Sequence, residues 1–391
     1  MGAGRLGGMQ LDRAQAEQLA RAGAAALQAG RAGEAKASFE RLVAAGQVNA
    51  QIWLLLAHSC RGLDDRAGEE KALDALLRDD PSNVRALIMK GDCRQVSGDD
   101  RAASSFYGSA AKLAARMPSL PPDLKAEVER IEEVSQANAA RFRRQLETQL
   151  GDAPHSDRFR ESLALMFGEK EIFLQKPSAY YFPGLPHIQF YAREEFPWVG
   201  AVEAAAGAMR AELEALLREE GLFRPYLEAS KDRPNYDFHG MLGNPDWSTL
   251  HLYENGGRIE ANVARCPRTF AAVSEAPLCH ITTRAPSVLF SLLRGGARIA
   301  PHHGMINTRL ICHLPLIVPP GCGFRVGNEV RQWEEGKLLI FDDTIEHEAW
   351  NDSDEDRVVL IFDVWRPELS ESERRSVAAM FEAIDGPPAQ S

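Results

Sequence analysis

Residues 357–365 read RVVLIFDVW, and this stretch indicates the fold class of the larger part of the chain. β-Branched and aromatic residues dominate it, which is typical of a β-strand. Because side chains alternate between the two faces of a strand, Arg357, Val359, Ile361 and Asp363 share one face. The stretch therefore predicts a strand that begins with an inward-facing arginine.

Similar short runs follow one another from about residue 177, separated by turn residues. The predicted strands lie at residues 288–293, 310–314, 323–326, 337–341, 346–350 and 357–365. Short strands at this spacing indicate a sandwich or jelly roll. We expect a helix at residues 201–219 to interrupt them. A capping box at Ser370 and Glu373 predicts a final helix that ends near residue 384.

The first third of the chain repeats with a period of 34 residues. The repeat places small residues at Gly23, Ala57 and Gly91, bulky residues at Phe39, Leu73 and Tyr107, and turn-like residues at Gly30, Asp64 and Gly98. A small residue lets the two helices of a repeat approach closely, and a bulky one fills the groove to the next repeat. The period resembles about three tetratricopeptide repeats over residues 12–116. The resemblance implies a groove for a peptide or partner protein; the alternative is a helical cap over the second domain.

The segment MPSLPP at residues 117–122 breaks the repeat pattern. Two charged helices are expected after it, at about residues 124–150 and 158–167. We therefore predict a multidomain chain: all-α repeats at residues 12–116, a helical connector at 117–174 and a β domain at 175–385.

Composition excludes several classes of protein. The chain has 391 residues and a formal net charge of −11, which disfavours nucleic acid as a partner. No run of residues is apolar enough for a membrane span or a signal peptide. Six cysteines stand without CxxC spacing, which favours free thiols in a reducing compartment over a disulfide framework or a zinc site. We expect a cytoplasmic protein.

Two motifs contain the candidate catalytic histidines, His302 in the segment APHHG and His347 in TIEHE. A jelly roll can bring such distant strands together at its mouth, where imidazoles are natural ligands of Fe(II). A buried Arg357 needs an anion, and a dicarboxylate cosubstrate fits the guanidinium fork. On a neighbouring predicted strand Arg309 and His313 share a face, so cationic donors gather around the two histidines.

Longer blocks around these residues resemble the aspartyl/asparaginyl β-hydroxylase family. They read WEEGK at 333–337, FDDTIEHE at 341–348 and DVWRPEL at 363–369, with YFPGLP at 181–186 and DWS at 246–248 upstream. The likeness covers about residues 175–370. It implies an Fe(II)- and 2-oxoglutarate-dependent dioxygenase, which consumes O2, on a double-stranded β-helix of the jelly-roll or cupin-like kind. Animal members of that family also carry tetratricopeptide repeats ahead of the catalytic domain.

The resemblance implies a role for each matching residue. It assigns His302 and His347 as the catalytic metal ligands, Ser291, His313 and Arg357 as ligands of 2-oxoglutarate, and Arg309 and Trp247 as substrate contacts. For Arg309 an ordinary salt bridge is the alternative. Glu346 and Glu348 alternate to the face opposite His347, so we expect them to support the ligands or to have structural roles, and not to bind the metal.

Two positions depart from common patterns. Gly304 stands where most iron oxygenases place a carboxylate ligand; the family resembles this chain in lacking it, so we expect water at that position. Ile311 stands where the family has an arginine that handles carboxylates. This exchange bears on either the geometry of the cosubstrate or the preference for an acidic substrate.

The expected reaction is hydroxylation of an unactivated C–H bond, at the β-carbon of an Asp or Asn residue in a peptide or protein that the repeats present. Several alternatives remain open: a free amino acid, a lipid or a natural product as substrate, halogenation at the open position beside Gly304, or a tetratricopeptide adaptor without activity.

Overall fold

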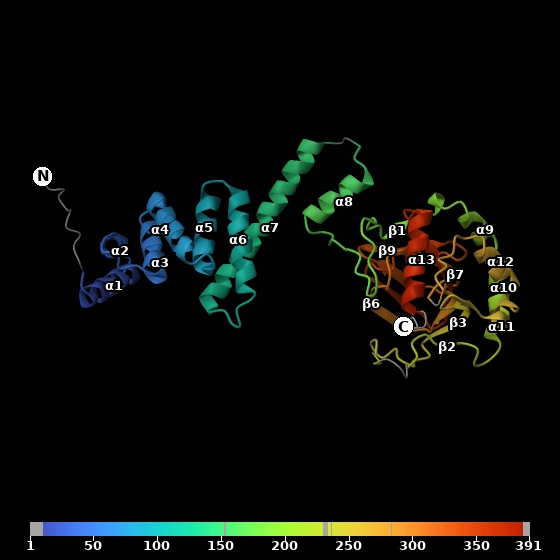
Figure 1. The fold of residues 1–391 in the computed structure, drawn as a ribbon. Coiled ribbons are helices and arrows are strands. Elements are labelled where there is room, and N and C mark those ends of the chain that lie inside the picture. The colour runs from blue at the N-terminus through green and yellow to red at the C-terminus, as the bar shows by residue number, and fades with distance from the viewer. Residues whose placement is uncertain (1–10, 152–153, 230–233, 236, 283, 386–391) are drawn as a thin grey trace. The chain divides into compact units, whose positions relative to one another are not determined.

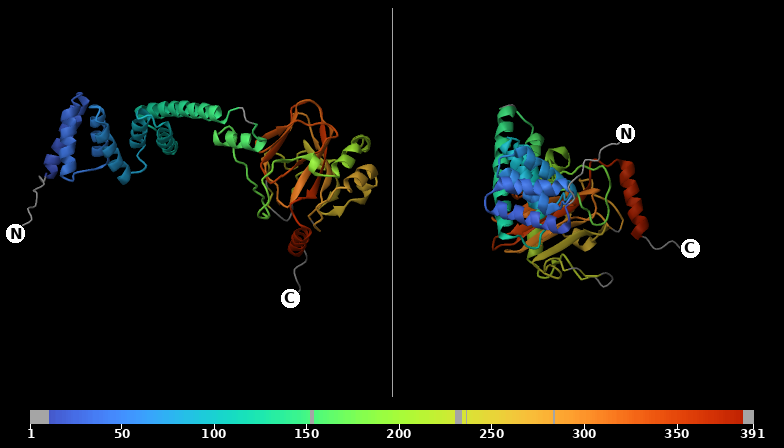
Figure 2. Two further views of the ribbon diagram at one scale, coloured as in Figure 1. Left: turned by 90° about the horizontal axis from the view of Figure 1, so that it is seen from above. Right: turned by 90° about the vertical axis from the view of Figure 1, so that its left-hand side faces the viewer.

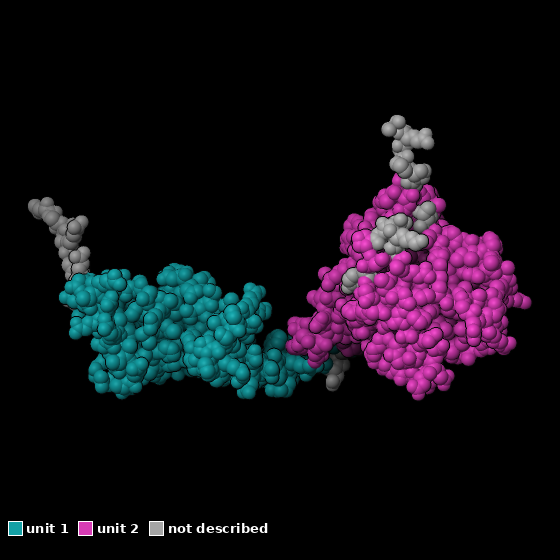
Figure 3. Space-filling view, turned by 90° about the horizontal axis from the view of Figure 1, so that it is seen from below, with its two compact units in different colours: residues 1–159 teal, residues 160–391 magenta. Residues whose placement is uncertain are grey.

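The computed structural model describes residues 11–151, 154–229, 234–235, 237–282 and 284–385. The chain divides into two compact units, residues 1–159 and 160–391, which Figure 3 colours separately. In the described ranges, none of the helices combines the length and the apolar composition that crossing a membrane requires.

Unit 1 confirms the predicted helical repeats. Its first six helices form three successive helix–turn–helix pairs (Figure 1). They are α1 (Arg13–Gln28), α2 (Ala32–Ala44), α3 (Ala50–Arg61), α4 (Arg66–Asp79), α5 (Val84–Val96) and α6 (Asp100–Ala114). The turn-like residues Gly30, Asp64 and Gly98 all have positive φ, at 75°, 54° and 80°. Because this conformation favours glycine and tolerates aspartate, the 34-residue period is visible in those residue types.

The small and bulky residues of the period meet inside each pair. A Cβ added to Gly91 would lie 2.4 Å from the Tyr107 ring, and one added to Gly23 would lie 2.9 Å from the Phe39 ring. The bulky side chain therefore lies directly on the small residue of its own pair. Phe39 also belongs to an apolar core that extends from α1 to α5.

Two helices follow the repeats where the sequence predicts them. The long helix α7 (Pro122–Leu150) packs against α6, and its residues Leu124, Val128 and Ile131 join the apolar core of the last pair. Helix α8 (Asp157–Met166) comes next. The N-terminal part of α7 thus closes the end of the repeat array.

Unit 2 contains two antiparallel sheets. The larger runs in the order β1-β10-β7-β12-β5-β3-β2, with β4 paired to β3, and the smaller in the order β6-β11-β8-β9. The larger sheet comprises β1 (Phe190–Tyr191), β2 (Arg224–Pro225), β3 (Trp247–Glu254), β4 (Gly257–Arg258), β5 (Val288–Leu293), β7 (Arg309–Ile317), β10 (Leu339–Phe341) and β12 (Arg357–Trp365). The smaller comprises β6 (Arg298–His302), β8 (Cys322–Val326), β9 (Glu329–Arg331) and β11 (His347–Asn351). Side chains from both sheets share an apolar interior, and this arrangement is the predicted double-stranded β-helix.

Helices cover the outside of unit 2. Helices α9 (Val199–Ala204), α10 (Ala206–Leu217) and α12 (Pro267–Val273) share a core with the larger sheet, near the short α11 (Glu260–Val263) and the 3₁₀ turn Arg193–Glu195 (Figure 1). The one helix expected at residues 201–219 is thus two helices that meet at Ala205. Helix α13 (Glu371–Asp385) lies on another side of the domain (Figure 2). It opens with the predicted capping box, in which Ser370 and Glu373 exchange hydrogen bonds.

Candidate active site

The two motif histidines meet where the smaller sheet ends. His302 is the last residue of β6 and the Cα partner of His347, the first residue of β11. Their ring centroids lie 4.0 Å apart. His302 Nδ1 lies 2.8 Å from the carbonyl oxygen of Ala300, and His347 Nδ1 lies 3.0 Å from that of Ile345. Since a carbonyl oxygen only accepts, each Nδ1 carries the proton, and each Nε2 keeps its lone pair for a metal.

The protonation of these rings also suits a metal. Burial lowers the pKa of His302, and it lowers the pKa of His347 well below the ordinary histidine value. Both imidazoles are therefore neutral at pH 7, as a ligand must be. Within the described residues no group of three or more His, Cys, Asp or Glu side chains is arranged to hold a metal ion.

A carboxyl group stands beside Gly304, the position where a third ligand is common. A Cβ added to Gly304 would lie 2.1 Å from Asp343 Oδ2, so only glycine fits against this side chain. The Gly304 N–H donates to the Asp343 backbone oxygen over 2.6 Å. Burial raises the pKa of the Asp343 carboxyl to about 7, against the opposing effect of Arg309. The space of the missing ligand is thus occupied by a carboxyl group from the turn between β10 and β11.

Arg357 is a buried cation without a counter-charge. The side chain is 1% exposed, and neither its Nε nor one of its terminal nitrogens has a hydrogen-bond partner in the described chain. Its guanidinium lies over the Trp333 ring, 5.2 Å from the centroid. Burial lowers the pKa of Arg357 to about 10. A buried guanidinium with free donors can bind an anion. The predicted dicarboxylate cosubstrate requires such a binding group.

His313 and Ser291 border the same cavity as His302 and His347. The His313 ring stacks on Trp333, with centroids 5.7 Å apart, and its Nδ1 has no partner among the described residues. Burial, with a contribution from the charge of Arg357, lowers the pKa of His313 well below the ordinary value. Ser291 Oγ lies 3.2 Å from Trp247 Nε1, which donates to it. The residues predicted to hold 2-oxoglutarate are therefore neighbours in the fold.

The predicted substrate residues line the same cavity. Arg309 pairs with Asp363, with 2.5 Å between a terminal nitrogen and Oδ2, so the salt bridge that the sequence left open is present. Trp247 stacks on Tyr226 with ring centroids 4.2 Å apart. Ile311 adds an apolar wall between Arg309 and His313 on β7.

The cavity extends from the histidines toward the surface in two parts. The inner part, about 630 Å³, is bordered by Trp247, Ser291, His302, His313 and His347. The outer part, about 830 Å³, is bordered by charged residues of β2, β3 and α13. Tyr226, Leu227, Ser287, Leu289, Met305 and Arg309 border both parts. Together they exceed the volume that a single amino acid needs.

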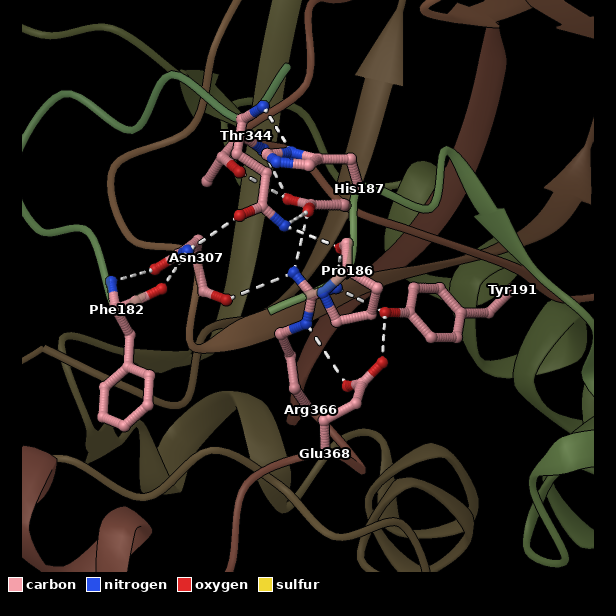
Figure 4. A network of polar contacts seen from close by, with 10 residues as sticks. Phe182, Pro186, His187, Tyr191, Asn307, Thr344, Arg366 and Glu368 are labelled. Atoms are coloured by element: carbon pink, nitrogen blue, oxygen red, sulfur yellow. Dashed lines mark hydrogen bonds and ion pairs between the residues drawn. The ribbon is translucent and has the colours of Figure 1, made fainter. Parts of the chain in front are cut away.

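A buried polar network holds the two histidine loops in place (Figure 4). Arg366, which is fully buried, pairs with Asp342 at 2.8 Å. The same Asp342 accepts from Gln175 and from the backbone and hydroxyl of Thr344. Asn307 donates to Gln175, and its carbonyl oxygen accepts from Arg366. The network joins the loop before His347 to the loop after His302.

Four residues of the site carry no sequence prediction: Asp343, Asp363, Trp333 and Tyr226. Asp343 and Trp333 lie within the segments that resemble the family, and that resemblance makes both of them candidates. Asp363 shares the face of Arg357 by alternation. Tyr226 lies in a stretch without a motif. Glu346 and Glu348 both pair with Arg325.

Comparison with known proteins agrees with this geometry. Residues 203–367 match the family model described as aspartyl/asparaginyl beta-hydroxylase. The protein of that name from Mus musculus is 38% identical over 169 residues, which are 42% of this chain and 22% of the mouse protein. The ornithine lipid ester-linked acyl 2-hydroxylase of Rhizobium tropici is 38% identical over 180 residues, 45% of this chain and 60% of that protein. The chain thus spans about a fifth of the mouse relative's length.

Solved structures resemble the helical unit. PcrH from Pseudomonas aeruginosa is 24% identical, with a TM-score of 0.30, and the match covers 33% of this chain and 94% of that one. The tetratricopeptide domain of OM64 from Arabidopsis is 18% identical, with a TM-score of 0.27, over 30% of this chain and 94% of that one.

Proposed function

We infer that the C-terminal domain of this chain, in which residues 203–367 match the family model, belongs to the aspartyl/asparaginyl β-hydroxylase family and is preceded by a tetratricopeptide-like helical region. Members of this family typically depend on Fe(II) and 2-oxoglutarate. We propose that the chain is an active hydroxylase of this kind. His302 and His347 hold the metal through their Nε2 atoms, and Arg357, His313 and Ser291 hold the cosubstrate.

The observation that carries the proposal is the unpaired Arg357. A buried guanidinium without an anion destabilises the fold, so its presence needs a reason. A carboxylate of 2-oxoglutarate supplies the missing charge and accepts the free N–H groups. An adaptor that had lost its activity would gain stability by replacing this residue, so the retained arginine supports catalysis.

The chain's own residues orient the reactants and keep water away. When bound, Fe(II) and 2-oxoglutarate supply the oxidation that converts O2 and a substrate C–H into a hydroxyl group, with succinate and CO2 as products. The carbonyl oxygens of Ala300 and Ile345 fix both imidazoles in the ligating tautomer. The apolar walls around Ile311 exclude water from the reacting carbon.

For the substrate, we propose an Asp or Asn residue in a peptide or protein. The two-part cavity, larger than one amino acid, supports an extended substrate. The helical repeats are proposed to bind that partner, since arrays of this kind offer long concave surfaces. The name of the Rhizobium tropici relative raises a lipid acyl chain as the second candidate, which the apolar lining of the inner cavity favours.

The test is product mass measured together with succinate. Purified protein with Fe(II), 2-oxoglutarate and O2 is incubated with a library of Asp- and Asn-containing peptides, and with an acyl lipid in parallel. We expect one product to gain about 16 Da, in equal amount to succinate. Succinate without any hydroxylated product in both arms contradicts the substrate proposal, and no succinate at all contradicts the activity.

A further inference from the structure

The segment WEEGK at residues 333–337 contains no residue with a proposed role in catalysis. It lies in the loop between β9 and β10, so it joins the smaller sheet to the larger one. Its first residue, Trp333, packs against two residues that are proposed to hold the cosubstrate. The Arg357 guanidinium lies over the Trp333 ring, 5.2 Å from the centroid. The His313 ring is nearly parallel to the indole, with 14° between the planes and 5.7 Å between the centroids.

Two backbone contacts tie this loop to β7, the strand that carries His313. Glu335 accepts a hydrogen bond from the Val318 N–H over 2.9 Å, directly after the end of β7. The Gly336 N–H donates to the carbonyl oxygen of Pro315, within β7, over 2.8 Å. The loop therefore has a defined position relative to the His313 side of the cosubstrate site.

Two helices hold the same loop from outside. Glu203 of α9 accepts from the Leu338 N–H over 2.9 Å and from Lys337 Nζ over 3.1 Å. Arg210 of α10 pairs with Glu335, with 2.6 Å between nitrogen and oxygen. A site residue keeps its position when the surrounding contacts fix the element that carries it. The polar residues of the segment thus support the loop that carries the tryptophan.

Arg357 needs a support of this kind because its charge is buried. The side chain is 1% exposed, and its Nε and one terminal nitrogen have no hydrogen-bond partner in the described chain. The electron-rich face of an indole attracts a guanidinium, most strongly where water is excluded. An arginine side chain that is not held in place must be ordered whenever it binds an anion, and this ordering lowers affinity. The Trp333 ring can both attract the guanidinium and fix its orientation.

We propose that Trp333 is a positioning residue of the cosubstrate site, whose ring holds the Arg357 guanidinium and the His313 imidazole in the orientation that binds 2-oxoglutarate. This inference rests on the proposed function, in which Arg357 and His313 bind the cosubstrate, and it adds a third residue to that site. It also gives the WEEGK segment a function, because the remaining residues of the segment anchor the ring.

The test is a double-mutant cycle on the affinity for 2-oxoglutarate. Calorimetry measures the Kd of 2-oxoglutarate for the full chain with Mn(II) under nitrogen, where no turnover occurs. Trp333→Leu removes the aromatic face and should weaken binding about tenfold or more. Trp333→Met retains more of the volume without a ring and should weaken binding as strongly. In an Arg357→Met background Trp333→Leu should change the Kd by about threefold at most, because no guanidinium remains for the ring to hold.

Two further variants separate positioning from a general loss of packing. Trp333→Phe keeps an aromatic face, so its Kd should stay within about threefold of the wild type. Trp350→Leu is the matched control and should leave the Kd unchanged. The Trp350 ring also lies beside a guanidinium, 5.9 Å from that of Arg298, but on the face of β11 opposite His347. Circular dichroism and urea unfolding show which variants are folded in the assay.

The outcomes distinguish this inference from the proposed function. If Arg357→Met weakens binding while Trp333→Leu and Trp333→Met do not, the inference is overturned and the cosubstrate site stands. An equal loss in Trp333→Phe, or an undiminished effect of Trp333→Leu in the Arg357→Met background, also overturns it, since the ring then acts through packing alone. If Arg357→Met binds too weakly to measure, the contrast between Trp333→Leu and Trp333→Phe decides. Wild type without affinity for 2-oxoglutarate, or Arg357→Met with undiminished affinity, contradicts the proposed function and this inference together.

Discussion

Replacing Arg357 with methionine should stabilise the protein in the absence of 2-oxoglutarate. Methionine retains most of the volume and removes a charge that is 1% exposed and unpaired. Burial lowers the pKa of Arg357 from the ordinary arginine value to about 10, and each pKa unit corresponds to about 1.4 kcal/mol. The guanidinium is charged in both states at pH 7, so its whole penalty is present there and is relieved only above pH 10. We expect the free energy of unfolding of Arg357→Met to exceed that of the wild type by about 3 kcal/mol.

The assay is urea unfolding followed by tryptophan fluorescence, since five of the six tryptophans lie after residue 160 and report on the C-terminal domain. Arg366→Met is the matched control. It removes an equally buried arginine that is paired with Asp342, so it should destabilise by about 3–5 kcal/mol.

The same samples test binding. Mn(II) with 2-oxoglutarate should raise the unfolding midpoint of the wild type but not that of Arg357→Met, because the ligand stabilises only a fold that binds it. If Arg357→Met is destabilised as strongly as Arg366→Met, or keeps the ligand-induced rise, the interpretation of Arg357 as a vacant anion receptor is wrong.

Three further predictions follow from close contacts and burial. Gly91→Ala should destabilise unit 1 by about 1–3 kcal/mol, since the new methyl group meets the Tyr107 ring. In the control Gly108→Ala the methyl group faces open space, so this change should stabilise unit 1 by about 1 kcal/mol. Thermal melting followed by circular dichroism measures the stability of both variants. Gly304→Asp should lower the melting temperature and fail to raise Fe(II) affinity, because Asp343 fills the space, and tighter iron binding would contradict this. Because burial raises the pKa of Asp343 to about 7, the free energy of unfolding should fall as pH rises from about 4 to 7. Asp343→Asn should flatten that fall in the metal-free protein. An unchanged pH profile of stability in this variant would contradict the prediction.

The elements of the fold are largely predictable from local patterns. The positive φ at Gly30, Asp64 and Gly98 favours glycine or aspartate, so the helical period can be recognised from these residue types in the sequence. The strands β5 and β12 begin and end at the predicted residues, because buried strands carry dense runs of β-branched and aromatic residues. The break between α9 and α10 was not predicted, since alanines around residue 205 favour helix on either side.

The site is less predictable because its decisive features are pairings across strands. Alternation places Arg357 and Asp363 on one face, but it does not tell which of them finds a partner. Arg309 finds Asp363 from the adjacent strand, whereas Arg357 finds none among the described residues. Likewise, the missing ligand at Gly304 is visible in the sequence, while the Asp343 side chain that fills its place depends on how two distant loops meet.

The conversion of 2-oxoglutarate to succinate by the purified full chain tests the central claim most directly, measured with and without Fe(II) and in His302→Ala and His347→Ala. We predict conversion that requires Fe(II) and is lost in both variants while their folds persist by circular dichroism, since each removes one of the two proposed metal ligands. Conversion at the wild-type rate in either variant, or none in the iron-loaded wild type, would contradict the assignment of this cavity as an iron-dependent oxygenase site.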